Sequence, residues 1–302
     1  MLDLNTLPTF IGRTQSQTDF TGVHRFERLG ATLDRDLLGD RPSVVPPLGH
    51  WLCFLPGEPQ QAFGEDGHPA RSENGFLPDI ALPRRMCAGS RVQFLQDLPL
   101  NAPVERISTI LKASPKEGRS GQMVFVTVQH DIRPKGGETA IIEGQDLVYR
   151  EAAPTGTAFV RNAAPAEPFD GIVRSITPDS RLLFRYSALT FNAHRIHYDR
   201  EYARDGEGYR GLVVQGPLLA TLMVDHLVRE TAGRIENFAF RASSPTFADE
   251  PIDLRHDVGG GDAQLQIVGK AGDPKDRRLG HARPSANACL CQQAKEGRQE
   301  QP

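Results

Sequence analysis

The sequence is short of the features that mark membrane proteins and nucleic-acid-binding proteins. No apolar run among its 302 residues approaches the roughly 20 residues that a helix needs to cross a bilayer. Lysine and arginine, 35 together, do not exceed the 38 aspartates and glutamates, so there is no basic excess to bind nucleic acid. Hydrophobic residues make up 38% of the chain and charged residues 24%. These proportions predict a soluble globular protein that binds neither a membrane nor nucleic acid.

A recognisable targeting signal is also absent from the start of the chain. Residues 1–15 have no basic beginning followed by an apolar stretch, as a secretory signal would have. They are also poor in arginine for a mitochondrial transit peptide. We therefore predict a cytoplasmic location.

Cysteine is scarce, with four residues in the chain. Cys289 and Cys291 stand too close together for a disulfide framework, and no zinc spacing is visible. Cys53 and Cys87 lie in apolar surroundings, where reduced core residues are expected. The sequence therefore points away from cysteine chemistry.

One segment near the middle, residues 151–168, is rich in alanine, proline, threonine and glycine and has no sustained hydrophobic period. Such a composition is typical of a linker, which we place at residues 153–168. It separates an N-terminal domain over residues 1–152 from a C-terminal domain over residues 169–271. Residues 272–302 have no helix or strand period and are predicted to be disordered. Because such a domain would be expected to finish on another strand, we hypothesise that a frame change replaced it.

Hydrophobic periodicity predicts an α+β pattern that repeats in the two halves. A helix is expected over residues 19–34 and another over 211–231, where apolar residues recur at helical spacing. Antiparallel strands are expected over residues 91–98, 104–114, 122–132 and 138–150, and then over 169–176, 182–191, 235–247, 250–258 and 263–271.

Two histidines, His194 and His197, stand three residues apart in the polar stretch FNAHRIHYDREYA, residues 191–203. They could be metal ligands, an acid/base pair or surface residues, although no third metal ligand lies within motif distance. Gly216 and Pro217 could form only a helix start, or the free N–H of Gly216 could donate to an oxyanion. If the two segments lie together, they suit proton transfer beside a thioester carbonyl.

The segment FRYSALTFNAHRIHYDREYA…GLVVQGPLLATLM resembles the MaoC-like region of hot-dog-fold acyl-thioester hydratases and dehydratases. That family shows Leu-Ser-Gly-Asp-x-Asn-Pro-Ile-His, followed by a helix entered through a His-Gly pair. Leu189, Thr190, Ile196 and His197 match the pattern, and Gly216 falls on the helix-entry glycine. The resemblance implies that His197 is the catalytic histidine and that the Gly216 amide is the oxyanion donor.

Three positions depart from the family's pattern. The catalytic aspartate falls on Asn192, the asparagine on His194 and the proline on Arg195. Asn192 cannot take a proton, although it can hydrogen-bond a water or a substrate hydroxyl. The changed motif is similar to that of the type 2 hydroxyacyl-thioester dehydratases. The resemblance therefore implies His197 as the principal acid/base, with His194 or Asn192 orienting it or the water.

Longer strings in the first half carry the resemblance further. HWLCFLP, GFLPDIALPRRMCAG and KEGRSGQMVFVTVQHDI resemble the N-terminal dehydratase-like domain of the mesaconyl-C4-CoA (3-methylfumaryl-CoA) hydratases. Cys87 departs from this family, which is expected to have tryptophan there. The resemblance spans residues 8–270 and implies a double hot-dog fold, in which each half wraps an antiparallel sheet around a helix. Only the second half then carries the catalytic motif.

The resemblance implies reversible addition of water to an α,β-unsaturated acyl-CoA, without a metal or organic cofactor. The expected reaction interconverts (S)-citramalyl-CoA with mesaconyl-C4-CoA plus water. Arg84 and Arg85, in a proline-flanked loop, could hold CoA phosphates or the distal carboxylate of the substrate, or could be merely solvated. Arg195 is a second candidate for the carboxylate.

Several alternatives stay open. A broad (R)-3-hydroxyacyl-thioester dehydratase is one, and a non-catalytic acyl-CoA-binding protein is another. A hot-dog thioesterase would need a carboxylate to activate water, where the motif offers Asn192. The assembly also stays open between a homodimer and a monomer whose two halves pair.

Overall fold

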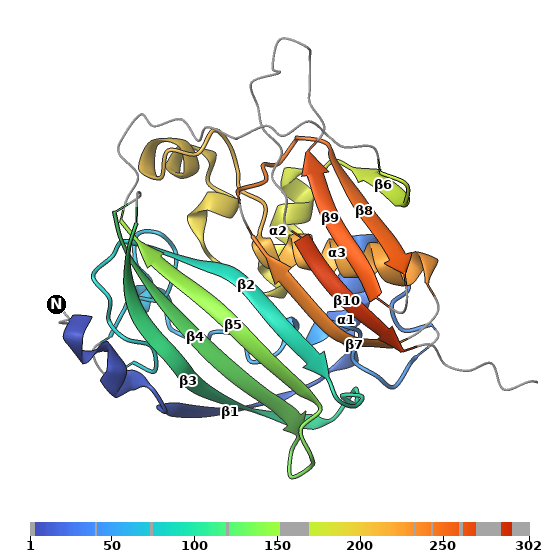
Figure 1. The fold of residues 1–302 in the computed structure, drawn as a ribbon, viewed down its shortest axis with the longest axis horizontal. Coiled ribbons are helices and arrows are strands. Elements are labelled where there is room, and N and C mark those ends of the chain that lie inside the picture. The colour runs from blue at the N-terminus through green and yellow to red at the C-terminus, as the bar shows by residue number, and fades with distance from the viewer. Residues whose placement is uncertain are drawn as a thin grey trace, which may run out of the picture.

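One antiparallel sheet runs through both halves of the chain (Figure 1). The computed structural model describes residues 4–39, 41–72, 75–118, 121–151, 169–231, 234–242, 244–259, 262–269 and 285–291. Across these residues the sheet has ten strands in the order β1-β3-β4-β5-β2-β7-β10-β9-β8-β6. The first five strands of that order belong to the N-terminal half and the last five to the C-terminal half.

The bounds of the elements follow chain order. The strands are β1 (Thr14–Phe20), β2 (Arg84–Phe94), β3 (Pro103–Gly118), β4 (Gly121–Pro134), β5 (Ile141–Arg150), β6 (Ile172–Ile176), β7 (Arg234–Arg241), β8 (Ile252–Gly259), β9 (Asp262–Gly269) and β10 (Ser285–Cys291). The helices are α1 (Val23–Leu33), α2 (Ser180–Leu189) and α3 (Gly216–Glu230), with short helical turns at Leu4–Phe10, Gly49–Leu52, Gln60–Ala62, Arg195–His197 and Tyr202–Gly206. None of the described helices is long and apolar enough to cross a membrane.

Strand β4 shows how the sequence pattern produces the sheet. Val124, Val126, Val128 and Ile132 alternate with less buried residues and all face the interior, because successive side chains of a strand point to opposite faces. His130 takes the same buried face among these apolar residues. The strand predicted from this alternation is confirmed, and it extends the predicted segment at both ends.

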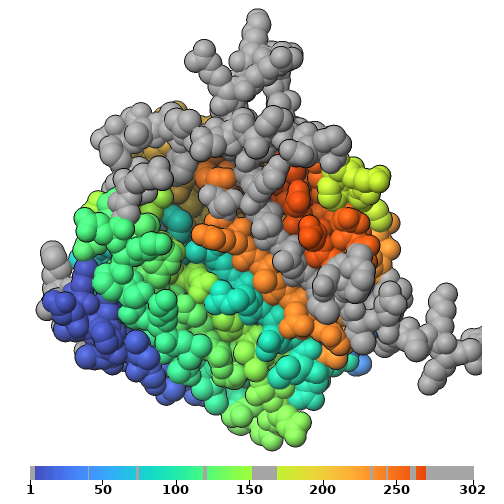
Figure 2. Space-filling model, in the orientation of Figure 1, coloured from blue at the N-terminus to red at the C-terminus, as the bar shows by residue number. Residues whose placement is uncertain are grey.

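The two halves meet where β2 pairs with β7. Gly89 to Gln93 of β2 lie antiparallel to Arg241 to Asn237 of β7, so backbone hydrogen bonds continue the sheet from one half into the other. Figure 2 shows the blue-to-green N-terminal half against the orange C-terminal half along this face. The arrangement makes the two halves one sheet rather than two separate sheets.

Helix α3 is the central helix of the C-terminal half, and it packs on β8 and β9. Every residue from Leu218 to Leu227 is buried, which is typical of a helix enclosed on all sides. Pro217 in the first turn has no N–H to lose there. The apolar core continues from this helix to Phe26 of α1 and Val92 of β2, so both halves share one core.

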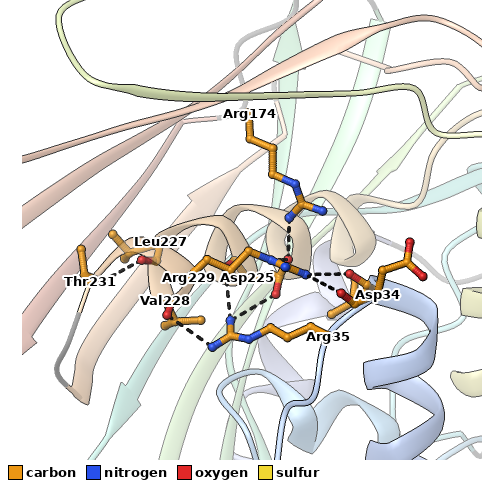
Figure 3. A network of polar contacts seen from close by, with 9 residues as sticks. Asp34, Arg35, Arg174, Asp225, Leu227, Val228, Arg229 and Thr231 are labelled. Atoms are coloured by element: carbon orange, nitrogen blue, oxygen red, sulfur yellow. Dashed lines mark hydrogen bonds and ion pairs between the residues drawn. The ribbon is translucent and has the colours of Figure 1, made fainter.

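A buried carboxylate, Asp225 of α3, also links the halves (Figure 3). It accepts hydrogen bonds from Arg174 of β6 at 2.8 Å, from Arg229 at 2.8 Å and from Arg35, which follows α1, at 3.2 Å. Arg229 in turn donates to the carbonyl of Leu33 at the end of α1. Three guanidinium groups from separate segments therefore converge on one carboxylate.

The strand predicted over residues 182–191 is wrong, because this segment forms helix α2. Asp179 accepts a hydrogen bond from the Leu182 backbone N–H at 2.9 Å and so caps the helix. Leu183 and Tyr186 then fall on one buried face at helical spacing. The apolar content of the segment had suggested a strand, whereas the cap and the three-residue spacing favour a helix.

The prediction of disorder over residues 272–302 is wrong for Ser285–Cys291, which form β10 between β7 and β9. An inner strand finds backbone partners on both sides, and these bonds do not depend on side-chain periodicity. The final strand that was expected of the domain is therefore present. Its apparent lack was the reason for the frame-change hypothesis, and that reason no longer holds. The predicted linker at 153–168 and the rest of 272–302 lie outside the described residues.

Candidate active site

A cavity of about 440 Å³ lies where the two halves face each other, and this volume is typical of small-molecule sites. Its lining draws on both halves of the chain. From the first half come Cys53, His68, Arg85, Cys87, Ser90, Arg106, Ser108, His130 and Glu143 among others, and from the second Tyr186, Asn192, Ala193, Gln215, Pro217 and Phe240 among others. A ligand in the cavity would therefore contact both halves of the chain.

The predicted motif turns into the cavity just after α2. Phe191 has a positive φ of 49°, which reverses the chain direction in a conformation that few side chains adopt. Asn192 then uses its side-chain oxygen to accept a hydrogen bond from the His194 backbone N–H at 3.0 Å. Asn192 lines the cavity, and the group that it leaves free there is its NH₂, a donor.

His197 is held with one ring nitrogen on the protein. Its Nδ1 lies 2.7 Å from the carbonyl oxygen of Val213, and because a carbonyl only accepts, Nδ1 carries the proton. Burial, aided by the neighbouring His194, lowers the pKa of His197 to about 3. The ring is therefore neutral near pH 7, and Nε2 has no hydrogen-bond partner among the described residues.

His194 stands between two other imidazoles. Its ring centroid lies 5.2 Å from that of His197, nearly perpendicular, and 4.1 Å from that of His68. Its Nε2 lies 3.4 Å from Oε1 of Glu207. His68 and Asn192 line the cavity, and His194 and His197 adjoin it through the contact of the His194 ring with His68.

A loop from the first half brings His68 to this cluster. His68 Nδ1 lies 3.0 Å from Oδ2 of Asp66, and the His68 backbone N–H donates to Oδ1 at 2.9 Å. Although burial opposes ionisation, these hydrogen bonds hold the pKa of Asp66 at about 2. Burial lowers the pKa of His68, and the bond to Asp66 opposes that effect. Sequence reasoning missed both residues, because nothing in their local pattern places them beside the motif.

Gly67 is the point at which this loop touches the motif. The Arg195 backbone N–H donates to the carbonyl of Asp66 at 2.9 Å. Gly67 has a φ of +82°, and a Cβ added there would lie 1.9 Å from the carbonyl oxygen of Ala193. Glycine is therefore required for His68 to reach His194.

We expect Gly67→Ala to lower the free energy of unfolding by about 3 kcal/mol, because the left-handed backbone and the backbone clash both add strain. Gly136→Ala is the matched control, since Gly136 also has a positive φ but has open space around it. That control should lose only about 1 kcal/mol. Urea unfolding of both variants measures the difference, and equal losses would contradict the close contact at Gly67.

Helix α3 begins at the cavity. Gln215 precedes it and Pro217 follows in its first turn, and both residues line the cavity on either side of Gly216. The Gly216 N–H has no hydrogen-bond partner among the described residues, and a Cβ added there would meet nothing within 4 Å. An N–H at a helix start with open space beside it can bind an oxyanion.

Gln215 is held in one orientation beside this N–H. Its Nε2 donates to the Leu183 carbonyl at 3.0 Å and to the Ser187 hydroxyl at 2.9 Å, so both contacts come from α2. Its Oε1 is buried and has no partner in the described part of the chain. The sequence predicted the glycine of this pair and not the role of its neighbour.

Of the three arginines predicted to bind substrate, Arg85 alone lines the cavity. The Arg84 guanidinium donates to the Glu207 carbonyl at 2.6 Å and is buried behind the lining. Arg195 pairs with Asp199 at 2.7 Å. Arg85 therefore lies at the site, whereas Arg84 and Arg195 are bonded to other protein groups.

A second polar cluster, missed by sequence reasoning, lies in the N-terminal part of the cavity. Glu143 accepts hydrogen bonds from His50 at 3.0 Å, from the indole N–H of Trp51 at 3.0 Å and from Ser90 at 2.5 Å. Burial opposes ionisation, but the His50 bond and its neighbours bring the pKa of Glu143 to about 2. The carboxylate is ionised with its oxygens occupied by donors, so it has little capacity to act as a base.

Throughout the part of the chain that the structure describes, no group of three or more histidine, cysteine, aspartate or glutamate side chains is placed to hold a metal ion. The His194 and His197 rings meet edge to face.

Comparison with known proteins shows which chains this one is similar to. Residues 48–248 match the family of hydroxyacyl-thioester dehydratase type 2. The mesaconyl-C(4)-CoA hydratase of Chloroflexus aurantiacus is 42% identical over 265 residues, which are 87% of this chain and 93% of that protein.

Solved structures agree on the fold. A MaoC-like dehydratase from Phytophthora capsici superposes with a TM-score of 0.67 at 16% identity, covering 97% of this chain and all of that one. A Mycobacterium tuberculosis protein described as having a double hot-dog fold gives a TM-score of 0.53 at 11% identity, covering 93% of this chain and 96% of that one. The molecule therefore has a double hot-dog fold, as the sequence predicted.

Proposed function

Because the chain belongs to the hydroxyacyl-thioester dehydratase type 2 family, we propose that it adds water reversibly to an α,β-unsaturated acyl-CoA thioester. The expected pair is mesaconyl-C4-CoA and (S)-citramalyl-CoA, in line with the name of the Chloroflexus relative. One observation carries the proposal. Gln215 and Pro217, on either side of the unpartnered Gly216 N–H, line the same cavity as Asn192 and His68, and the His68 ring is joined through His194 to a neutral His197 with Nε2 unbonded.

The Gly216 N–H would hold the thioester carbonyl oxygen. As water adds to C3, the electron pair of the C2=C3 bond moves toward that oxygen, and an enolate develops. The N–H and the positive end of the α3 dipole stabilise this charge without reorganising. C2 then takes a proton, and the carbonyl is restored.

His197 would activate the attacking water. Its Nε2 can only accept, because Nδ1–H is committed to Val213. The NH₂ of Asn192 can donate to the water oxygen or, in the reverse direction, to the leaving hydroxyl. The His194 ring packs edge to face against the His197 ring and so restricts its orientation.

Arg85 is the proposed partner of the distal carboxylate. It lines the cavity and makes no ion pair among the described residues, so its guanidinium is available to a substrate anion. Mesaconyl-C4-CoA carries such a carboxylate, whereas crotonyl-CoA does not.

We expect Arg85→Gln to lower kcat/KM for mesaconyl-C4-CoA by about 100-fold, the usual cost of a lost charge-assisted hydrogen bond. Crotonyl-CoA hydration should be unchanged. Arg91→Gln is the matched control, because Arg91 lies on the same strand but pairs with Asp146 at the surface. Steady-state kinetics with both substrates measure the effect. Equal losses for the two substrates would show that Arg85 acts on a group that both share. Similar wild-type kcat/KM values for the two would favour a broad 3-hydroxyacyl-thioester dehydratase, the second candidate that the family description supports.

The reaction itself is tested with a panel of acyl-CoA thioesters read by mass spectrometry. Gain of one water by mesaconyl-C4-CoA supports the proposal. Release of free CoA with no hydrated product would favour the thioesterase, and binding without any conversion would favour the non-catalytic alternative. The cytoplasmic location stays a prediction, as does the choice between a homodimer and a monomer, which light scattering decides.

A further inference from the structure

The catalytic motif in the second half is incomplete as an acid/base site. Asn192 stands where the resembling family has an aspartate, and an amide cannot take a proton. Its oxygen is moreover occupied by the His194 backbone N–H, so the side chain presents a donor to the cavity. A proton acceptor beyond His197 must come from another segment if the site has one.

The N-terminal half brings an imidazole–carboxylate pair, His68 and Asp66, to the motif. His68 lines the cavity together with Asn192, and its ring lies against His194, which in turn lies against His197. Its Nδ1 is bonded to Asp66, so Nε2 is the nitrogen left for a ligand. No other described residue bonds that nitrogen.

The partners of the two imidazoles differ in a way that decides which one can carry charge. The Nδ1 of His197 is bonded to a neutral carbonyl, and no carboxylate of the described residues is bonded to its ring. The Nδ1 of His68 is bonded to the carboxylate of Asp66, which stabilises an imidazolium as it forms. Of the two rings, His68 is therefore better suited to hold a proton during a reaction.

We propose that His68, oriented by Asp66, is a second catalytic residue that supplies the proton acceptor missing at Asn192. The inference rests on the proposed hydration. As the C3–O bond forms, one O–H bond of the water breaks and its proton goes to Nε2 of His68. His197 Nε2 accepts a hydrogen bond from the other O–H, which stays on the product as the hydroxyl. The His68 imidazolium then returns its proton to C2 as the enolate collapses, and both rings end neutral.

The arrangement also explains why the active site needs both hot-dog units. The oxyanion donor, Asn192 and His197 come from the C-terminal half, whereas His68 and Asp66 come from the N-terminal half. The joint between them is the contact of Gly67 with Ala193 and the bond from the Arg195 N–H to Asp66.

The test compares His68→Gln and Asp66→Asn with the wild type in hydration of mesaconyl-C4-CoA and crotonyl-CoA. We expect kcat to fall by about 100-fold or more for His68→Gln, with KM changed little, because glutamine keeps the volume but cannot accept the proton. His24→Gln is the matched control. His24 also pairs with a carboxylate, Glu27 at 2.8 Å, but lies exposed on α1.

A pH profile separates proton transfer from a merely structural role. The groups that bear on His68 are Asp66, which raises its pKa, and His194 and Arg85, which lower it. Loss of the carboxylate in Asp66→Asn should lower the pKa of His68. Since the base must be neutral to act, the acid limb of kcat/KM should move to lower pH while the plateau falls.

Three outcomes are distinguishable. A large loss in His68→Gln together with the shifted limb in Asp66→Asn supports the proposal. Activity of His68→Gln within about threefold of wild type, or a lowered plateau with an unmoved limb, overturns the catalytic role and leaves the hydratase function standing. A wild-type protein that hydrates none of the acyl-CoA thioesters overturns the function and this role together.

Discussion

His197→Ala is expected to reduce kcat for acyl-CoA hydration by about 100-fold, because the attacking water loses the imidazole nitrogen that accepts its hydrogen bond. His197 presents an unbonded Nε2 because Val213 holds its other nitrogen, and its pKa of about 3 keeps it neutral. Steady-state kinetics with mesaconyl-C4-CoA measure the loss. KM should change little, since the proposed partner of the ring is the reacting water rather than the CoA.

Because His197 is 7% exposed, alanine also leaves a void, and a second variant separates the two effects. Asparagine places its NH₂ where Nδ1 of the histidine stands, so it can still donate to the Val213 carbonyl, but it is too short to place an acceptor at the position of Nε2. His197→Asn should therefore keep the thermal stability of the wild type more closely than His197→Ala while losing a similar amount of activity. Hydration by His197→Asn within tenfold of the wild type would remove the proposed role of His197.

Asp225→Asn is expected to lower the free energy of unfolding by about 3 kcal/mol, because it leaves the arginines around a buried site without their counter-charge (Figure 3). The arginines are 23–31% exposed, and this partial access to water holds the loss to the lower end of the usual range for a broken buried pair. Urea unfolding measures the change.

Asp205→Asn is the matched control for this substitution. Asp205 pairs with Arg204 at 2.8 Å, but both side chains are more than 60% exposed, so water and salt screen the pair. Its unfolding midpoint should equal that of the wild type. Equal midpoints for Asp225→Asn and Asp205→Asn would show that the network does not join the two halves energetically.

The sequence predicted the elements that have a strong local period. The alternation along β4 and the wide apolar face of α3 each follow from which side chains must leave water, so both elements are present where they were expected. Over residues 182–191 the hydrophobic period was weak, and the predicted strand was wrong. α2 had been expected as a strand, although Asp179 caps it as a helix.

The motif was visible as a sequence pattern, since His194, His197 and Gly216 lie within about 22 residues from the end of α2 to the start of α3, and its catalytic role stays a prediction. Which arginine faces the cavity was not readable. Arg84 and Arg85 are neighbours on β2, and successive residues of a strand point to opposite sides. Only the position of the sheet relative to the cavity decides that Arg85 lines it.

The sequence by itself determined that the chain repeats an α+β unit and that the second unit carries the histidine motif, and the family resemblance implies an acid where Asn192 stands. Tertiary structure alone decided what stands beside that asparagine. His68 and Asp66 are more than 120 residues away along the chain, and nothing in their own spacing points to the motif. They reach it because β2 and β7 join the two halves in one sheet and because Gly67 has no side chain to keep the loop from Ala193. Contacts of this kind depend on shape and backbone hydrogen bonds between distant segments, and hydrophobic periodicity reports only on the nearest neighbours.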